Sequence, residues 1–554
     1  MGIITACIKR TDIISCIQSY LALASLVIYA SGFALVDEKV QFVGVFGFFV
    51  ANVIFGCLAI ADRVMFLMLH AGLFLFLLTR PLVATFDSSR SWNMSSYETA
   101  VMALFSIMLT MLCLRIGAIG ANLIKGRRHL SIKRSHDESC EASAVKFHFG
   151  IGWLGSEEGK RCIRYAALFL YMGCFAVSML IGYQRLNYMS GRAYEEYYMA
   201  TRDDYSSPLL GNFEVMLPFA LCAYLATQPS KRGSTIALVL FIVTTLPLLI
   251  IGARTDFVMA VLFFGVYYLL RNSVPEEHGV WIGPFEKTLV CIGLPLGIAA
   301  MGAVNYLRAN QSASGDFLWL LGDTLYKQGV TFKVLGLGFD WYPQIHELGF
   351  MGFTFYPIIH NFTQGFIGQV FLHMPLLPEV NSVELALYGS SYGNTISYFA
   401  HPNYLGGEGY GSCYLLELYT DFGFAGIAVF SVLLGFLSVH ICRLVGKNWF
   451  GGMLALLAIY NVFHIARGTV LEWCGFLFKT RFWAFLVLLI AGAFLLLIIM
   501  HKKHTVCPKR VSLGCLLLEP LGEMDVTKNR CGLTVLQMNG RNGISRLGKR
   551  DCND

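Results

Sequence analysis

The main pattern along the chain is a series of apolar runs of about 20 residues, separated by polar stretches. An α-helix of that length crosses the hydrocarbon core of a bilayer, which is about 30 Å thick. Twelve such runs occur, at 13–35, 41–60, 64–84, 100–123, 165–183, 209–227, 235–251, 257–270, 288–304, 412–439, 450–465 and 483–500. The pattern predicts an all-α, polytopic integral membrane protein with about 12 transmembrane helices.

One more apolar run, 350–374, does not fit a simple crossing. Its interior contains Pro357, His360, Asn361 and Gln364, and polar side chains are costly in lipid. A crossing here would also move the basic segments that follow it to the other side of the membrane. We therefore expect a re-entrant or interfacial segment within one large outer loop, 305–411, because irregular backbone is tolerated where it is buried in protein or lines a cavity.

The basic residues orient this arrangement. Segments 125–160 and 501–554 are rich in Lys and Arg, and such segments normally lie on the cytoplasmic side. Both termini are therefore predicted to be cytoplasmic. The chain divides into helices one to nine (1–304), the outer loop (305–411), helices ten to twelve (412–500) and a basic tail (501–554) that we expect to be disordered.

Composition excludes several classes of protein. Hydrophobic residues make up 56% of the chain and charged residues 14%, against about 25% charged in typical soluble domains. A soluble enzyme, a disordered protein and a coiled coil are therefore excluded. The 16 cysteines form no CxxC pair, so neither a zinc site nor a disulfide framework is indicated. The basic segments carry no recognition motif, and no nucleic-acid partner is expected.

Arginines in the outer loops are few and therefore informative. Arg254 lies in the tight turn IIGARTDF, Arg308 directly follows the ninth run, and Arg467 follows the eleventh. A guanidinium group makes bidentate contacts with phosphate, so these arginines could converge on one diphosphate. Alternatively, Arg254 pairs with Asp256 as an interfacial anchor and the other two are ordinary snorkelling residues.

Candidates for a general base lie around the start of the tenth run. Glu417 and Asp421 are four residues apart, which places both carboxylates on one helix face. His401 lies in the glycine-rich stretch YFAHPNYLGGEGYG. Either residue type can accept a proton from a sugar hydroxyl, although carboxylates are also favoured near a helix N-terminus for structural reasons. No HExxH or similar spacing occurs, so neither a metal nor another cofactor is expected.

At this point a family resemblance becomes visible. The series of apolar runs, the large outer loop and the following GSCYLLELYTDFGFAGIAVF resemble O-antigen polymerases of the Wzy type. The IIGARTDF turn is similar to the Gly-x-Arg turn of that family. The resemblance extends over 13–500 and is sharpest around Arg254 and over 401–426.

The resemblance implies a glycosyltransferase of the bacterial inner (cytoplasmic) membrane, similar to the GT-C class, that acts in lipopolysaccharide biosynthesis. Its periplasmic site would transfer a glycan from undecaprenyl pyrophosphate to the next lipid-linked repeat unit, without a metal and with inversion. Implied partners are undecaprenyl-pyrophosphate-linked oligosaccharides, membrane lipids and a chain-length regulator protein. Carried onto this chain, the implied diphosphate ligands are Arg254, Arg308 and Arg467, and the implied catalytic residues are Arg254, His401 and Glu417.

Two alternatives share much of this pattern. An O-antigen ligase-like glycosyltransferase would have nearly the same architecture. A lipid-linked oligosaccharide flippase would also have about twelve helices, but it would be built from internal repeats with short loops. The chain has no clear internal repeat and has a large outer loop, which favours the polymerase.

Overall fold

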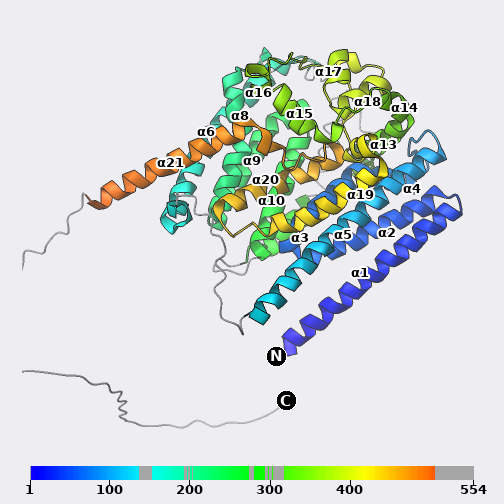
Figure 1. Cartoon of the computed structure of the whole chain (residues 1–554), viewed down its shortest axis with the longest axis horizontal. Helices are drawn as coiled ribbons and strands as arrows, with labels where there is room; N and C mark the ends of the chain where they lie inside the picture. Colours follow the sequence, from blue (N-terminus) through cyan, green and yellow to red (C-terminus); the bar gives the residue numbers. More distant parts are fainter. Residues whose placement is uncertain are drawn as a thin grey trace, which may run out of the picture. The chain divides into compact units, whose positions relative to one another are not determined.

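The computed structural model describes residues 2–135, 152–192, 204–273, 280–293 and 317–505, with the single residues 196, 200, 201, 297 and 302. All regular elements in these ranges are helices, and none of the described residues forms a strand (Figure 1). The predicted tail from 506 onward and Arg308 lie outside the described residues.

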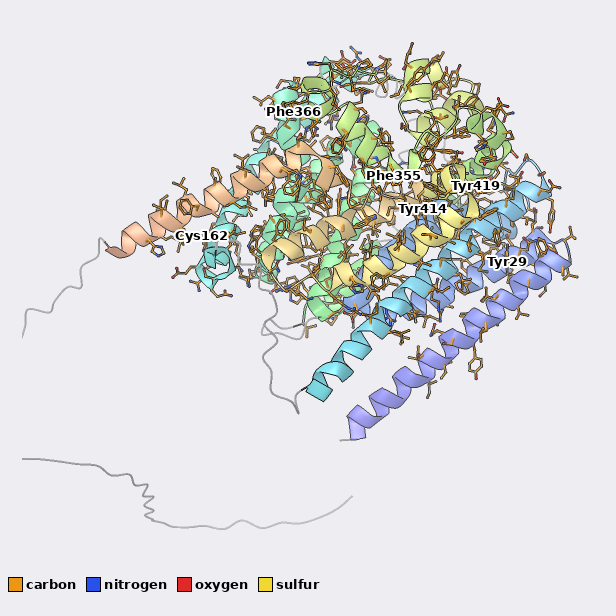
Figure 2. The ribbon with its side chains drawn as sticks, in the orientation of Figure 1. Tyr29, Cys162, Phe355, Phe366, Tyr414 and Tyr419 are labelled. Carbon is orange, nitrogen blue, oxygen red and sulfur yellow. The ribbon has the colours of Figure 1, made fainter. Side chains whose placement is uncertain are left out.

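Ten helices in the described part of the chain are long and apolar enough to cross a membrane. They are Ile13–Ala34, Glu38–Cys57, Ile60–Phe86, Tyr97–Ile124, Glu157–Met189, Pro208–Ala226, Lys231–Ile251, Tyr414–Cys442, Trp449–Arg467 and Thr480–His501. Each corresponds to one of the twelve predicted runs, so the prediction of an all-α, polytopic membrane protein is confirmed. Helices α1 (Gly2–Ala34) and α21 (Thr480–Thr505) expose many apolar side chains, as lipid-facing helices do (Figure 2).

The two remaining runs, the eighth and the ninth, do not correspond to any of these ten helices. About half of the ninth run, 288–304, lies outside the described residues. The eighth run falls in α10 (Thr255–Ser273), which packs along α9 (Lys231–Ile251). The hydroxyl groups of Tyr268 and Thr235 lie 2.5 Å apart. The C-terminal part of α10 therefore lies beside the N-terminal part of α9, so the two helices run side by side over nearly the same length. The total of twelve crossings stays a prediction.

Helix α5 (Tyr97–Ser135) packs along α19 (Tyr414–Cys442), although the two are far apart in sequence (Figure 1). Glycines permit this close approach. A Cβ atom on Gly117 would collide with the carbonyl oxygen of Val432, and one on Gly435 would collide with that of Leu114. Small residues at such crossings are the usual means by which membrane helices approach each other.

Segment 317–411 folds as short helices over one end of the bundle, which we call the outer end. Segment 350–374 contains η4 (Phe353–Phe355), α15 (Tyr356–Thr363) and α16 (Phe366–Val370), none of them long enough to cross. The backbone N–H of Thr354 donates a hydrogen bond of 2.8 Å to Asp421 in α19. The segment is therefore attached to the outer end of a long helix. The other short helices of this loop are α12 (Phe317–Gln328), α13 (Val330–Asp340), α14 (Tyr342–His346), α17 (Val383–Tyr388) and α18 (Tyr392–Ala400).

Candidate functional site

Arg254 occupies the connection between α9 and α10. Gly252 ends α9 with a φ of +113°, a left-handed conformation that favours glycine, and only Ala253 and Arg254 precede α10. The neighbouring Asp256 is close enough to interact electrostatically with Arg185 of α6 (Glu157–Met189). It also interacts with Tyr460 of α20 (Trp449–Val462). Arg254 therefore lies where α9 and α10 approach α6 and α20.

Arg467 is held at the outer end of α20, in the turn η6 (Phe463–Arg467). Its Cγ and Nε atoms lie 3.2 Å from the position that a Cβ atom on Gly411 would occupy. Its guanidinium carbon is 6.0 Å from the ring centroid of Phe76, which belongs to the π-helical turn η1 (Phe74–Leu78). Turns of this kind often occur at functional sites. Arg467 thus lies between a glycine-rich loop and an irregular helix turn.

Glu417 is completely buried in the first turn of α19. One of its carboxylate oxygens accepts a hydrogen bond of 2.6 Å from the Ser412 hydroxyl, and the other accepts one of 3.3 Å from the Val470 N–H. These bonds tie the end of the loop 401–412 to the segment that follows Arg467. A carboxylate with both oxygens bonded and no exposed surface is suited to holding these two segments together.

His401 ends α18 and is partly exposed. Its Nε2 atom lies 3.5 Å from a carboxylate oxygen of Glu408, and the side chain retains 18% of its accessible surface. Its Nδ1 atom accepts a hydrogen bond of 3.3 Å from the Asn403 N–H, which assigns the ring proton to Nε2. The imidazole and Glu408 therefore form a pair at the surface of the outer end.

Tyr410 connects His401 to a lysine from another element. The rings of His401 and Tyr410 meet edge to face, with their centroids 5.0 Å apart. The Nζ atom of Lys333 in α13 lies 3.4 Å from the Tyr410 hydroxyl oxygen. The Tyr410 N–H donates a hydrogen bond of 2.7 Å to the Ser397 hydroxyl. The loop is thus fixed next to a second cation besides Arg467.

A second carboxylate, that of Glu472, lies close enough to Glu417 to interact with it electrostatically. Burial raises the pKa of Glu472, although the Lys479 ammonium acts in the opposite direction. Burial also raises the pKa of Tyr356, and the charges of Glu472 and Glu417 add to that shift. Burial lowers the pKa of His360, with a further contribution from Lys479. The segment after Arg467 therefore meets α15 through ionisable groups.

We call the residues that these contacts connect the outer polar site. Its members are Lys333, His401, Glu408, Tyr410, Glu417 and Arg467. Three of the sequence-predicted residues, His401, Glu417 and Arg467, are linked here through the loop 401–412. Arg254 belongs to a neighbouring group, which includes Tyr460 of α20, the helix that leads directly into η6 and Arg467. Among the described residues, no group of three or more His, Cys, Asp or Glu side chains is placed to hold a metal ion.

Sequence reasoning did not select Lys333, Glu408 or Tyr410. Glu408 and Tyr410 lie in the same glycine-rich stretch as His401, so the sequence pattern that points to His401 also contains them. Lys333 had none, because only the tertiary structure brings it to a residue 77 positions away.

The comparison with protein families gives one match. The family model described as O-antigen polysaccharide polymerase Wzy matches residues 14–503, nearly the whole chain. Neither a curated protein nor a solved structure matches the chain.

Proposed function

The chain belongs to the O-antigen polysaccharide polymerase Wzy family, and on this premise we propose that it joins undecaprenyl-pyrophosphate-linked repeat units at the periplasmic face of the bacterial inner membrane. Family membership makes it a polymerising glycosyltransferase of the membrane that acts on lipid-linked oligosaccharide repeat units. The carrier lipid, the membrane and the side of action are parts of the proposal. The side of action is supported by the basic segments 125–160 and 501–554, which favour a cytoplasmic location for both termini. The carrier lipid and the membrane are taken from what the family resemblance implies.

The observation that carries the proposal is the contact between Arg467 and the loop 401–412 at the outer end. In the transfer, an acceptor hydroxyl oxygen bonds to the anomeric carbon of the donor sugar, and the bond from that carbon to the pyrophosphate oxygen breaks. The pyrophosphate leaves with the electron pair and develops negative charge. A fixed guanidinium group stabilises such a charge, especially near a low-dielectric wall.

We assign the pyrophosphate to Arg467 and Arg254, and the sequence adds Arg308 to this set. The positive charge is then supplied by guanidinium groups, so we expect polymerisation without a metal ion. Direct displacement of the pyrophosphate by the acceptor oxygen inverts the anomeric centre.

The proton of the acceptor hydroxyl passes to a carboxylate oxygen of Glu408, and the protonated Nε2 of His401, 3.5 Å from that carboxylate, holds it in place. Glu408 retains 44% of its side-chain surface and can meet a sugar hydroxyl directly. Glu417, expected from its position to be a base, has no exposed surface. We therefore propose that it acts as a positioning residue, which holds Ser412 and the adjoining Gly411 against Arg467. A chain-length regulator protein remains a proposed partner.

The test is polymerisation by the purified protein in lipid nanodiscs. Lipid-linked repeat units isolated from the host strain are supplied with EDTA in one arm and with Mg²⁺ in the other, and the products are separated by size. We expect a ladder spaced by one repeat unit in both arms.

Other products would point elsewhere. A ladder only with Mg²⁺ would contradict the metal-independent mechanism. A single transfer onto a different acceptor lipid would indicate a ligase. Passage of unchanged substrate across vesicle membranes, without a ladder, would indicate a flippase.

A further inference from the structure

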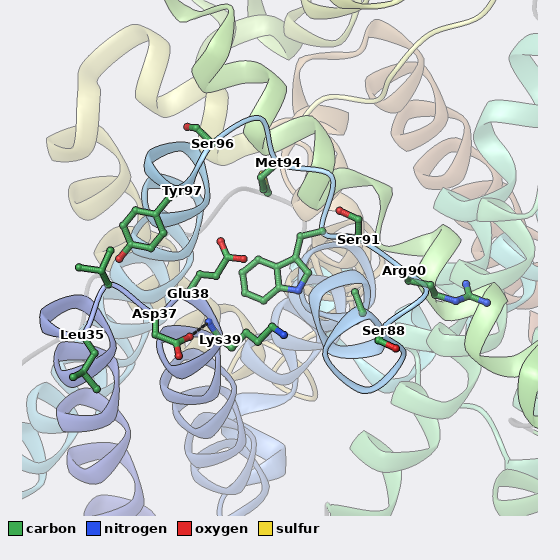
Figure 3. A pocket seen from close by; sticks show the side chains of 13 residues that line it. Leu35, Asp37, Glu38, Lys39, Ser88, Arg90, Ser91, Met94, Ser96 and Tyr97 are labelled. Atoms are coloured by element: carbon green, nitrogen blue, oxygen red, sulfur yellow. Dashed lines mark hydrogen bonds between the residues drawn. The ribbon is translucent and has the colours of Figure 1, made fainter.

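A cavity of about 970 Å³ opens at the outer end, between the α1–α2 connection and the α4–α5 connection (Figure 3). It lies between the end of α4 (Thr79–Phe86) and the starts of α2 (Glu38–Cys57) and α5. We propose that this cavity is a glycan subsite that binds an uncharged sugar residue of the polymer or repeat unit. The inference rests on the proposed function and deepens it. Pockets of a few hundred to about 1,000 Å³ are typical of small-ligand sites.

The aromatic part of the lining is rigid. Trp92 lines the cavity and is only 7% exposed. Its ring meets the rings of Phe42 and Phe332 edge to face, with centroids 5.7 Å and 5.8 Å away. Tyr97 also lines the cavity, and its hydroxyl oxygen accepts a hydrogen bond of 2.9 Å from Gln41. Tyr97, which keeps part of its surface exposed, offers an apolar surface with a polar group beside it, which matches a sugar ring with its C–H face and its hydroxyl groups, and the buried Trp92 keeps this lining rigid.

The polar part of the lining offers hydrogen bonds for hydroxyl groups. Figure 3 shows the Glu38 carboxyl group and Lys39 directed into the cavity. Within the described part of the chain, no residue donates a hydrogen bond to the Glu38 carboxylate. The hydroxyl groups of Ser88, Ser91 and Ser96 add further donors and acceptors. An isoprenoid chain would require an apolar lining instead.

The charges make a phosphate an unsuitable occupant. Arg90 lines the cavity, but its guanidinium points away from the other lining side chains (Figure 3) and forms ion pairs with Asp323 at 2.9 Å and with Asp87 at 2.8 Å. Asp37 caps α2 by accepting hydrogen bonds from the backbone of Lys39 and Val40. The cavity therefore has two carboxylates and one available ammonium group, a balance that disfavours an anion.

The cavity lies one helix away from the outer polar site. Phe332, which contacts Trp92, directly precedes Lys333, which bonds Tyr410 beside His401. A glycan that reacts at the outer polar site could therefore extend across α13 and place a sugar residue several units away in this cavity.

The connection between α4 and α5 is also fixed before any substrate binds. Asp340 of α13 accepts hydrogen bonds from Ser95 at 2.7 Å and from Thr99 at 2.9 Å. The Tyr326 hydroxyl donates one of 2.6 Å to the carbonyl oxygen of Ser91. A preformed site loses little free energy to ordering on binding.

The test measures binding without requiring activity. The probe is the lipid-free oligosaccharide released by mild acid from the repeat units of the host strain, titrated by calorimetry into the full-length protein in nanodiscs. The variants are Glu38→Gln and Trp92→Phe. The matched control is Glu98→Gln, an exposed carboxylate next to Tyr97 that does not line the cavity.

We expect Glu38→Gln to weaken binding about tenfold, because a charge-assisted hydrogen bond is lost. Trp92→Phe should weaken it as well, whereas the control should bind as the wild type does. Unchanged binding by both cavity variants, or no binding by the wild type, would overturn the subsite.

The ladder assay is run in parallel on the same preparations. A wild-type ladder with unaffected cavity variants would reject the subsite and leave the polymerase proposal intact. Binding that depends on Glu38 without any ladder would support the subsite and reject the polymerase proposal.

Discussion

Two polar groups in this apolar bundle use similar side chains in different surroundings. The first is the outer polar site. The second, which we call the helix network, consists of Gln18, Asn52, His70 and Arg115. Arg115 donates hydrogen bonds to the side-chain oxygens of Gln18 and Asn52. Asn52 in turn lies 3.0 Å from Nε2 of His70. All four side chains are at most 9% exposed and belong to long helices.

The difference lies in which segments carry the residues and how exposed they are. In the helix network, His70 also bonds the carbonyl oxygen of Phe66 at 2.8 Å, so its two ring nitrogens both have partners from the bundle. In the outer polar site, His401 and Glu408 lie in a loop and keep exposed surface. Loops on a rigid scaffold commonly carry function, whereas buried and fully bonded polar groups commonly specify structure. A buried arginine in a spanning helix is therefore not by itself evidence of a reaction site.

The largest effect is expected for Arg467→Ala. Removing the guanidinium that stabilises the leaving pyrophosphate should lower the ladder rate about a hundredfold. Arg467→Lys should retain part of the rate, because it keeps the charge but loses the bidentate geometry. Thermal unfolding in detergent serves as the control for folding. A wild-type rate in a folded Arg467→Ala protein would remove Arg467 from the site.

The next effect concerns stability. Arg115→Met leaves the buried oxygens of Gln18 and Asn52 without their donor, and a buried unsatisfied polar group costs about 1–3 kcal/mol. The free energy of unfolding should fall by about 2 kcal/mol. The ladder rate per folded molecule should stay the same. A lower rate at unchanged stability would assign the helix network to the reaction.

Glu417→Gln separates positioning from proton transfer. The amide oxygen can still accept the Ser412 hydrogen bond, but the amide nitrogen cannot accept from Val470, so about 1 kcal/mol of stability should be lost. The ladder rate should fall less than tenfold. A base contributes about 10²–10⁴-fold, so a loss of that size with normal folding would identify Glu417 as the base.

The smallest effect is a pH dependence at Glu472. Burial raises its pKa in the folded protein, so the folded state holds this proton more tightly than the unfolded state does. The resulting penalty is absent below the usual carboxyl range and grows as the pH rises through that range to the raised pKa. Glu472→Gln should therefore stabilise the protein at pH 8, by less than about 1 kcal/mol, and leave stability unchanged at pH 4. If Glu472→Gln and the wild type unfold identically at pH 8 as well as at pH 4, this assignment is wrong.

Much of the fold was predictable because hydrocarbon thickness imposes one run length on every crossing helix. That rule found the ten described spans, and the polar interior of 350–374 correctly argued against a single crossing helix there. Run length does not predict features that depend on tertiary contacts, such as the π-helical turn at Phe74–Leu78.

The candidate site was predictable only in part. Residue type and loop position selected His401, Glu417 and Arg467, and the family match confirms the resemblance on which their roles were based. The burial of Glu417 and the lysine from α13 could not be predicted, because both depend on how the loop 401–412 packs against other segments. The roles themselves stay predictions.

The most direct test of this account compares Arg467→Ala with Arg115→Met in one ladder assay, normalised to the amount of folded protein. The account predicts a rate about a hundredfold below wild type for Arg467→Ala and a wild-type rate for Arg115→Met. Equal rates for the two variants, whether both high or both low, would contradict the assignment of the reaction to the outer polar site.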